Sequence, residues 1–381
     1  MTPSPSDNKT LAADIIVAGA GPAGVAAALA TAKRGLKTLL VDSHTMPGGT
    51  VHHAGIHTIC GLYAMDEGEA VPAVSPATQQ WITQIATSPC RRGRAHILPM
   101  KHGDFTRSAQ ALLDAQPDIT TRFGLTLKAG MKLTCRALID TTGRAAILSQ
   151  LGLPVAPTDP TCPGLGFQLK GIGQGTRPGH LDVLRSFATA ERGYMPIFSE
   201  TPDMTGHLNG ILNLPPTQRP DDISALTLHA RSRLEDMLDI LTARFPVFAQ
   251  ATPAWVADEV GFRSGKTVRT AQPIDKAMVM EGGEKSAQVR GHWPIEWWSD
   301  ISGPDYVYPP RRGFGIPDAC LIASHTLPVF TAGMSLSATS QGQGAVRVAG
   351  TCLETGNRAG ILAAQTARNA ATHTFRLGEH N

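Results

Sequence analysis

The feature that most constrains this chain is a glycine-rich turn between an apolar strand and a small-residue helix near the start of the sequence. Residues 13–18 (ADIIVA) form a continuous apolar run with β-branched side chains, which is typical of a buried parallel strand. GAGPAG follows at 19–24, and the Ala-rich stretch 25–34 is predicted to be a helix that ends at Gly35. Residues 37–42 (KTLLVD) then have the character of a second strand that ends in an acid. This βαβ order predicts an α/β fold with a Rossmann-like parallel sheet.

Each glycine of this G-x-G-x-x-G pattern has its own expected role. Gly19 permits the tight turn, Gly21 lets the backbone approach a pyrophosphate, and Gly24 lets the helix and strand pack closely. The helix N-terminus presents N–H groups and a positive dipole to the phosphates. Asp42 follows Gly24 by eighteen residues and can accept hydrogen bonds from the ribose of an adenosine. The spacing therefore favours a dinucleotide site over a glycine-rich turn without a ligand.

Two later segments are expected to belong to the same sheet and site. Residues 137–143 (ALIDTTG) form an apolar strand that runs into a small-residue turn, and 329–333 (VFTAG) form another strand. The sequence predicts a flexible turn at 340–344 (SQGQG) and a long helix over 345–367. The start of that helix would direct its dipole toward the edge of the sheet.

The nucleotide-binding domain is therefore expected to be discontinuous in sequence. It should comprise residues 12–150 and 310–381. The intervening residues 151–309 contain short strands, Pro-Gly turns and one predicted helix over 221–245. This composition predicts an inserted α+β substrate or cap domain.

Composition excludes several classes of protein. Hydrophobic residues make up 42% of the chain, which is typical of a globular protein. The 34 basic and 31 acidic residues nearly cancel, and no basic stripe interleaved with aromatic residues occurs, so nucleic acid is not an expected partner. The chain shows neither an apolar leader nor a run long enough to span a membrane, which predicts a cytoplasmic protein. The six cysteines lack C-x-x-C spacing, and we predict no metal site.

Several motifs together resemble the FAD-dependent oxidoreductase family of the glutathione-reductase-like flavoproteins. They are the glycine pattern at 19–24, PGGT at 47–50, IDTTGRA at 139–145, GFRSGKTVR at 261–269, GHWPIEWW at 291–298, GFGIP at 313–317 and the closing AGMSLSATSQGQGAVRVAGTCLETGNRAG at 332–360. The resemblance spans the chain and is most specific at its two ends.

This resemblance implies FAD as the cofactor. It places Gly48, Gly49 and Thr50 beside the flavin, and Gly333 and Met334 near its ribitol and pyrophosphate. Since only one G-x-G-x-x-G occurs, no separate NAD(P)H domain is expected. The complete set of predicted cofactor-binding residues is Gly19, Gly21, Pro22, Ala23, Gly24, Asp42, Gly48, Gly49, Thr50, Gly143, Gly333, Met334 and Gly344.

A flavin carries the redox chemistry itself, so the protein must supply binding, orientation and a proton donor or acceptor. His52 and His53 follow the PGGT segment directly, and imidazole titrates near neutral pH. Both are candidate catalytic residues. The alternative is that these histidines cap turns or bond to the backbone.

The segment GHWPIEWW holds three of the five tryptophans together with His292 and Glu296. Aromatic walls with one acid and one imidazole suit a small-ligand pocket, so both are further catalytic candidates. An edge strand that packs its tryptophans into an interdomain core explains the segment equally well.

The leading functional hypothesis is a dehydrogenase or oxidase that transfers a hydride from a small polar substrate to tightly bound FAD. A flavin-dependent monooxygenase and a non-catalytic flavin-binding scaffold are the alternatives. The sequence leaves open whether oxygen, a quinone or a protein accepts the electrons.

Overall fold

The computed structural model describes residues 10–66, 68–85, 87–173, 195–200, 206–301 and 303–378. Residues 1–9, which form most of the segment predicted to contain no apolar leader, lie outside the described residues. Within the described ranges, no helix combines the length and the apolar character needed to cross a bilayer.

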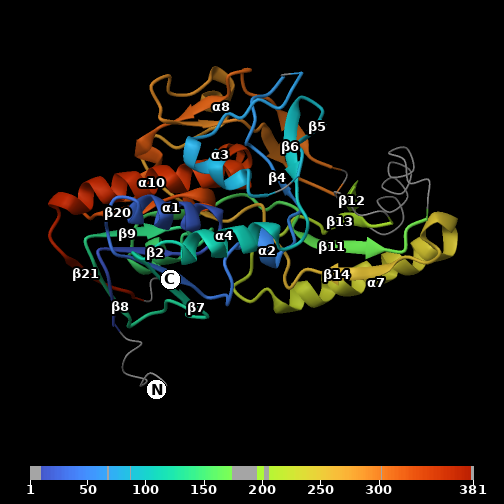
Figure 1. Cartoon of the computed structure of the whole chain (residues 1–381), viewed down its shortest axis with the longest axis horizontal. Coiled ribbons are helices and arrows are strands. Elements are labelled where there is room, and N and C mark those ends of the chain that lie inside the picture. The colour runs from blue at the N-terminus through green and yellow to red at the C-terminus, as the bar shows by residue number, and fades with distance from the viewer. Residues whose placement is uncertain are drawn as a thin grey trace.

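A five-stranded parallel sheet forms the centre of the nucleotide-binding part (Figure 1). Its central strands are buried along their whole length and are apolar except for Asp140, as expected when helices cover both faces of a parallel sheet. The order β20-β9-β2-β3-β7 brings a strand from the last quarter of the sequence beside strands from the first half. The predicted α/β fold is confirmed. The strands are β2 (Ile15–Ala18), β3 (Thr38–Asp42), β7 (Ile119–Phe123), β9 (Ala137–Asp140) and β20 (Val329–Thr331).

Two helices pack side by side against this sheet: α1 (Pro22–Ala32), drawn in blue, and α10 (Ala349–Asn369), drawn in red in Figure 1. Their backbones approach closely because α10 carries glycine at the contact. A Cβ atom on Gly356 or Gly360 would overlap the backbone of Ala23 or Ala27 on α1. The outer helices of this part are α4 (Asp104–Asp114) and α5 (Ala146–Gln150).

The glycine-rich segment predicted as a flexible turn is instead a helix, α9 (Ser340–Val346). The side chain of Thr339 caps it by accepting a hydrogen bond from the Gly342 backbone N–H. A Cβ on Gly342 would overlap the carbonyl of Ile274, so close packing outweighs the low helix propensity of glycine here. The prediction of a turn at this position is wrong.

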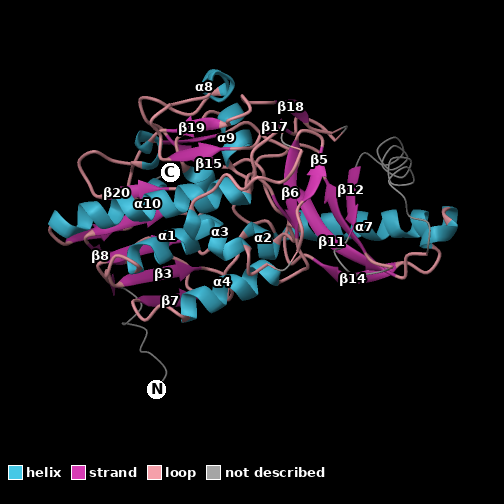
Figure 2. Ribbon diagram, turned by 45° about the horizontal axis from the view of Figure 1, so that its top comes forward, coloured by secondary structure: helices cyan, strands magenta, loops and turns pink. Residues whose placement is uncertain are grey.

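The middle of the chain builds a four-stranded antiparallel sheet with one long helix, seen at the right of Figure 2. The sheet and the helix share an apolar core that includes Phe167, Leu212 and Leu238. The helix that the sequence predicts over 221–245 is α7. The strand order is β12-β13-β11-β14, with β11 (Gly164–Lys170), β12 (Met195–Glu200), β13 (Leu208–Asn213), β14 (Thr252–Val256) and α7 (Ser224–Arg244).

A third apolar cluster joins segments on both sides of residue 310. It contains Val289 and Ile295 from the predicted inserted domain and Phe314 and Ala345 from the predicted C-terminal part. Strand β16 pairs with β19 across that boundary. Its elements besides α9 are α8 (Lys276–Glu281), β16 (Val289–Gly291), β17 (Ile295–Trp297), β18 (Asp305–Val307), β19 (Phe314–Ile316) and η3 (Asp318–Leu321).

Smaller sheets complete the described structure. One has the order β1-β8-β21, another the order β4-β6-β5, and β10 pairs with β15. The bounds are β1 (Thr10–Ala12), α2 (Thr50–His53), β4 (Thr58–Ile59), α3 (Pro76–Ile82), β5 (Cys90–Arg92), β6 (Ala95–Pro99), β8 (Lys132–Cys135), β10 (Val155–Pro157), η2 (Pro246–Phe248), β15 (Lys266–Val268), η4 (Gly333–Ser335) and β21 (His373–Arg376).

Candidate functional site

The turn between β2 and α1 has the geometry that its three glycines predict. Gly19 has a φ of 102°, in the region that favours glycine, and a Cβ there would meet the backbone of Thr141. A Cβ on Gly24 would overlap the Gly19 carbonyl, so this position brings the helix against the strand. At Gly21, in contrast, a Cβ would meet only the Cα of Gly49, at 3.9 Å. The middle glycine therefore faces space that described protein atoms do not fill.

The segment after β3 folds back onto this turn. The Gly48 N–H donates to the carbonyl of Ala20 at 2.8 Å, and Gly49 lies opposite Gly21. Thr50 begins α2 and packs its methyl group toward Gly261 in the loop after β14. Pro22 occupies the first turn of α1, whose N-cap has no side-chain hydrogen bond. The two glycine segments thus form one cradle at the N-terminus of α1, and we define the cradle as 19–24 with 48–49.

Asp42, the last residue of β3, is tied to this cradle. Its Oδ2 accepts from the Ala20 N–H at 2.5 Å, and its Oδ1 accepts from the His44 N–H at 2.8 Å and from His44 Nδ1 at 3.1 Å. Burial opposes its charge, but the bonds from His44 and Ala20 outweigh that effect and lower the pKa of Asp42. The hydrogen bonds to Asp42 and Glu259 raise the pKa of His44 to about 9. An anionic carboxylate is therefore held at the end of β3.

The remaining predicted cofactor residues fall into two groups. Gly333 has a φ of 68° and lies against Ala23 and Cys352, in the first turns of α1 and α10. Met334 follows Gly333 in η4, and a Cβ on Gly143 would meet no described atom within 4 Å. Gly344 lies elsewhere, because it packs in α9 against the backbone of Glu296. Gly333 thus joins the cradle region, whereas Gly344 allows α9 to approach β17.

Four histidines and one tryptophan form a chain of ring contacts where α2 meets the inserted sheet. We call this region, made of His44, His52, His53, His102 and Trp255, the seam. The rings of His44 and His53 are parallel, with centroids 3.8 Å apart, and His52 meets His53 edge-on. His102 stacks on His52, and its ring lies tilted by 34° against Trp255 of β14, with centroids 4.0 Å apart. Burial is the main cause of the lowered pKa values of His52 and His102. The two predicted catalytic histidines therefore lie together, connected through His44 to Asp42.

The other two catalytic candidates are not close partners of each other. His292 is buried with its Nδ1 unpaired among the described residues, and burial lowers its pKa to about 4. A Cβ on Gly313 would lie 2.8 Å from its ring, so the imidazole packs on the turn before β19. Neutral His292 can act as a proton acceptor only if substrate reaches this buried position.

Glu296 is the centre of a buried polar network. Its carboxylate accepts from Trp298 Nε1 at 2.8 Å, from Trp293 Nε1 at 3.1 Å and from Arg347 at 3.1 Å. Burial opposes ionisation of Glu296, but Arg347 and Arg263 outweigh it and lower the pKa. Arg263 in turn stacks on the Trp298 ring, 4.4 Å from its centroid. Trp293 and Trp298 thus pack around one buried ion pair, Glu296 with Arg347.

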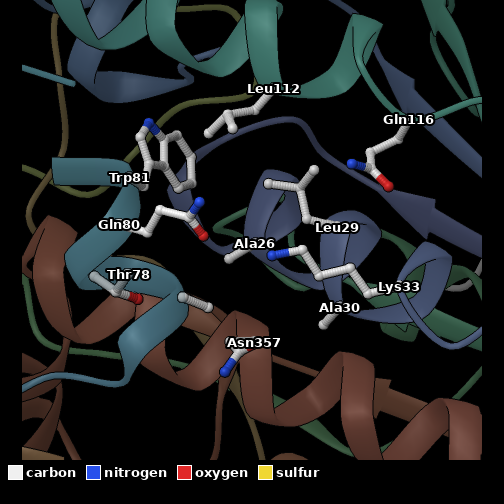
Figure 3. Close-up of a pocket in the computed structure, with 11 residues that line it drawn as sticks. Ala26, Leu29, Ala30, Lys33, Thr78, Gln80, Trp81, Leu112, Gln116 and Asn357 are labelled. Carbon is white, nitrogen blue, oxygen red and sulfur yellow. The ribbon is translucent and has the colours of Figure 1, made fainter. Parts of the chain in front are cut away.

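A small cavity lies away from the cradle, on the later turns of α1 (Figure 3). Its volume is about 170 Å³, below the ~300–1,000 Å³ of typical small-molecule sites. Leu29, Trp81 and Leu112 give it apolar walls, with Lys33 and Gln116 at its side. We do not assign it to the cofactor because it does not include a residue of the cradle.

The sequence profile of the FAD-dependent oxidoreductases matches residues 14–122 and 168–375, which is most of the chain. The chain belongs to this family.

Other likenesses are more distant. A ferredoxin–NADP reductase of Ralstonia pickettii (strain 12J) is 28% identical over 156 residues, which are 41% of this chain. That match spans only 39% of the reductase's own length. Among solved structures, the flavin-dependent brominase Bmp2 has a TM-score of 0.49 at 11% identity and is aligned over 94% of this chain and 80% of its own. A geranylgeranyl bacteriochlorophyll reductase-like protein of Thermoplasma acidophilum has a TM-score of 0.45 at 13% identity, over 94% and 79%.

FAD is the cofactor of this family, and the residues present fit it. The unfilled space at Gly21 lies at the N-terminus of α1, where backbone N–H groups and the helix dipole favour a pyrophosphate. The anionic Asp42 accepts three hydrogen bonds from Ala20 and His44, which leaves about one of its ~four lone-pair sites for a ribose hydroxyl. The cradle could therefore hold the pyrophosphate, and Asp42 the adenosine ribose.

Several residues that organise the site were not among those predicted from the sequence. Asp140 is fully buried at the end of β9 and accepts four hydrogen bonds, from Thr142, Ile147 and Leu148, so it fixes the turn that carries Gly143. The signal that could have identified Asp140 was its position in the IDTTGRA motif. Arg347 had no comparable signal, because its partner Glu296 is distant in the sequence.

Proposed function

We propose that this chain transfers a hydride from a small polar substrate to tightly bound FAD. The observation that carries the proposal is the cradle, in which Gly21 faces unfilled space beside the anionic Asp42. Support for a polar substrate comes from the seam next to the cradle, where His52, Asp258 and Glu259 combine imidazole and carboxylate groups with partial exposure. One G-x-G-x-x-G per chain agrees with a single dinucleotide cofactor.

When bound, FAD supplies the hydride acceptor. The work of the protein is binding and orientation: the cradle holds the pyrophosphate, and Asp42 holds the ribose. Asp140 keeps the turn at Gly143 rigid through its four hydrogen bonds. The protein must also supply a group that accepts a proton from the substrate.

For Glu296 we propose a positioning role. Its carboxylate already accepts from two indoles and Arg347, so proton uptake would break a buried network. The network holds β17 against Arg347, the residue that ends α9. Arg263, which stacks on Trp298, connects it to Asn213 of the inserted sheet. His292 remains a candidate for proton transfer on chemical grounds, since it is neutral and its Nδ1 has no partner among the described residues.

His52 and His53 also remain proposals for proton transfer. Their connection through His44 to Asp42 favours a location toward the adenosine half of the dinucleotide. A base must reach the reacting atoms, so these residues serve in proton transfer only if substrate binds at this seam. Substitution of each histidine by Ala separates the two roles, because only a general base affects the rate of flavin reduction.

The decisive experiment is an anaerobic screen of small polar metabolites against the flavin absorbance of the purified protein. A dehydrogenase or oxidase is expected to lose that absorbance with substrate alone. A monooxygenase would show loss only after separate reduction and would then need oxygen to modify its substrate. A scaffold would show no loss with any metabolite, which would overturn the proposal.

Two further parts of the proposal need their own measurements. The rate at which the reduced flavin is reoxidised can be measured with oxygen, with a quinone and with a protein carrier. The fastest of these rates identifies the electron acceptor. The predicted cytoplasmic location is tested by fractionation of cells that express the chain.

A further inference from the structure

Three metal-ligating side chains converge beside the histidine stack. His52 and His53 come from α2, and Asp258 lies two residues after β14. One donor atom from each lies within 4.8 Å of the other two. We propose that these three residues form a site for one divalent transition-metal ion of the zinc type.

The geometry around His53 is the first argument. Its Nδ1 lies 3.6 Å from Asp258 Oδ2, close to the ~3.3 Å between two ligands of a tetrahedral zinc ion with bonds of ~2.0–2.1 Å. Its Nε2 faces the carbonyl oxygen of Met46 at 3.5 Å. A carbonyl only accepts hydrogen bonds, so this contact favours the proton on Nε2 and leaves the Nδ1 lone pair toward the carboxylate. Two acceptors that face each other call for a cation between them.

The same contact has a known function in metal sites. Histidine ligands commonly donate their second ring N–H to a backbone carbonyl, which fixes the tautomer and the ring orientation. Met46 stands in that position for His53. Stacking on His44 holds the ring from one side, and His52 closes the other edge.

His52 supplies the second argument. Its Nδ1 is buried and has no hydrogen-bond partner among the described residues, which is unfavourable for a polar atom. Its ring is held between His53 and His102. A metal ion at this seam would satisfy an imidazole that the protein leaves unpaired.

The two segments that supply the ligands are already joined. The Glu259 N–H donates to the carbonyl of His53 at 3.0 Å, which fixes Asp258 next to α2. The surrounding charge also favours a cation. Three carboxylates lie here, those of Asp42, Asp258 and Glu259. They outnumber the basic side chains of His44 and Arg219, so the local net charge is negative even if both basic groups are charged.

The donor set determines the class of metal. Two imidazoles and one carboxylate suit zinc and neighbouring first-row ions, whereas calcium and magnesium prefer oxygen ligands throughout. Asp258 has a side chain that is 74% exposed, so the ion could enter from solvent and keep water in a fourth position. Bound there, it would clamp α2, which follows the cradle, to the inserted sheet.

The test uses the FAD-loaded protein after treatment with a chelator, titrated calorimetrically with Zn²⁺ alone. We expect one ion per chain. Asp258→Ala and His52→Ala should each weaken binding by ~100-fold or more, because loss of outer-shell partners alone costs about 10–100-fold. The matched control is His325→Ala, which removes an exposed histidine outside the cluster and should leave the affinity unchanged.

Three measurements keep the test independent of folding and of the proposed activity. An unchanged far-ultraviolet circular dichroism spectrum shows that a variant is folded, and Asp258→His should restore binding with a third imidazole. X-ray absorption at the zinc edge should show imidazole and oxygen ligands in the Zn²⁺-loaded protein. Failure to bind one ion, or equal loss of affinity in His325→Ala, would overturn the site and mean that surface histidines bind zinc adventitiously.

Discussion

The hydrogen atom that Gly21 carries in place of a side chain is the smallest feature on which cofactor binding depends. A Cβ there would meet no protein atom closer than Gly49 at 3.9 Å, so the fold itself tolerates a larger residue. We expect Gly21→Val to lower the flavin content sharply, because the side chain enters the space for the pyrophosphate. The flavin absorbance of purified protein measures this, and Gly68→Val, at an exposed glycine with open surroundings, is the control.

A second substitution, at Asp42, tests the same cofactor site. Asp42→Ala removes charged hydrogen bonds of about 1.5–3 kcal/mol each, which corresponds to roughly a 10- to 100-fold loss of FAD affinity. Because Asp42 also holds Ala20 and His44, part of the loss would come from a disordered cradle. Added FAD should raise the melting temperature of wild type much more than that of Gly21→Val. Colourless wild-type protein that gains no stability from FAD would contradict the whole assignment.

His52 and His53 can be assigned by separating rate from affinity. If either acts as a general base, its replacement by Ala should lower the rate of flavin reduction by ~100-fold or more while FAD remains bound. If they serve the adenosine half instead, FAD affinity should fall and the reduction rate of loaded protein should not. Stopped-flow reduction and FAD titration on the same variants distinguish these outcomes.

At the scale of elements, the Glu296–Arg347 pair joins β17 to the C-terminal end of α9. Both side chains are largely buried, at 14% and 11% exposure. Glu296→Ala should therefore reduce the free energy of unfolding by about 3–5 kcal/mol, since it leaves Arg347 and two indole N–H groups without their acceptor. Denaturant titration measures this. Arg233→Ala, which breaks an exposed pair with Asp236 in α7, should change stability by less than about 1 kcal/mol.

A second substitution at Glu296 tests its proposed positioning role. Glu296→Gln keeps an acceptor oxygen and should retain most of the flavin reduction rate if Glu296 only positions its neighbours. A large loss of rate in a stable Glu296→Gln protein would instead assign it to proton transfer.

Elements were predictable where one local pattern decided them. The βαβ unit of β2, α1 and β3 follows from apolar runs and glycine punctuation within 42 residues, and the structure places its ends within three residues of the predicted ones. The helix α9 was not predictable from local pattern, because Gly342 and Gly344 favour a turn by propensity. Their contacts with Ile274 and Glu296, far away in the sequence, decide the conformation.

The candidate site divides in the same way. The glycines and Asp42 could be predicted as cofactor-binding residues because their spacing is local. The His44–Glu259 contact joins residues 215 positions apart, and no pattern in one sequence announces such a pair. The contacts of GHWPIEWW likewise depend on tertiary packing, since Trp293 and Trp298 direct their N–H groups into a buried network with Glu296 and Arg347.

The molecule as a whole should lose stability in mild acid because of two buried imidazoles. Burial lowers the pKa of His57 and of His292 to about 4, against an ordinary value of 6.5. Between these values each of the two imidazoles binds more protons in the unfolded chain than in the folded one. Their contribution to the free energy of unfolding is therefore complete above pH 6.5 and is lost as the pH drops toward 4. By about pH 5 each histidine should contribute a loss of ~2 kcal/mol.

Urea unfolding at about pH 7.5 and about pH 5 measures this loss. His57→Gln should make the difference between the two conditions smaller by its own share, whereas His325→Gln at an exposed position should not change it. An unaltered pH dependence in His57→Gln would show that its imidazole is not the titrating group.

The packing of α1 against α10 has a consequence for how the protein is made. The fingerprint that binds the dinucleotide leaves the ribosome early, yet β20 and α10 come from residues 329–369. Until then the nascent sheet lacks an edge strand, and α1 lacks the helix whose Gly356 and Gly360 cover it. Since domains fold as units during synthesis, the vitamin-derived cofactor must join a chain that has already been synthesised through β20 and α10. Ribosome-bound chains that stop before β20 should therefore fail to retain FAD, and their exposed α1 makes them clients for chaperones.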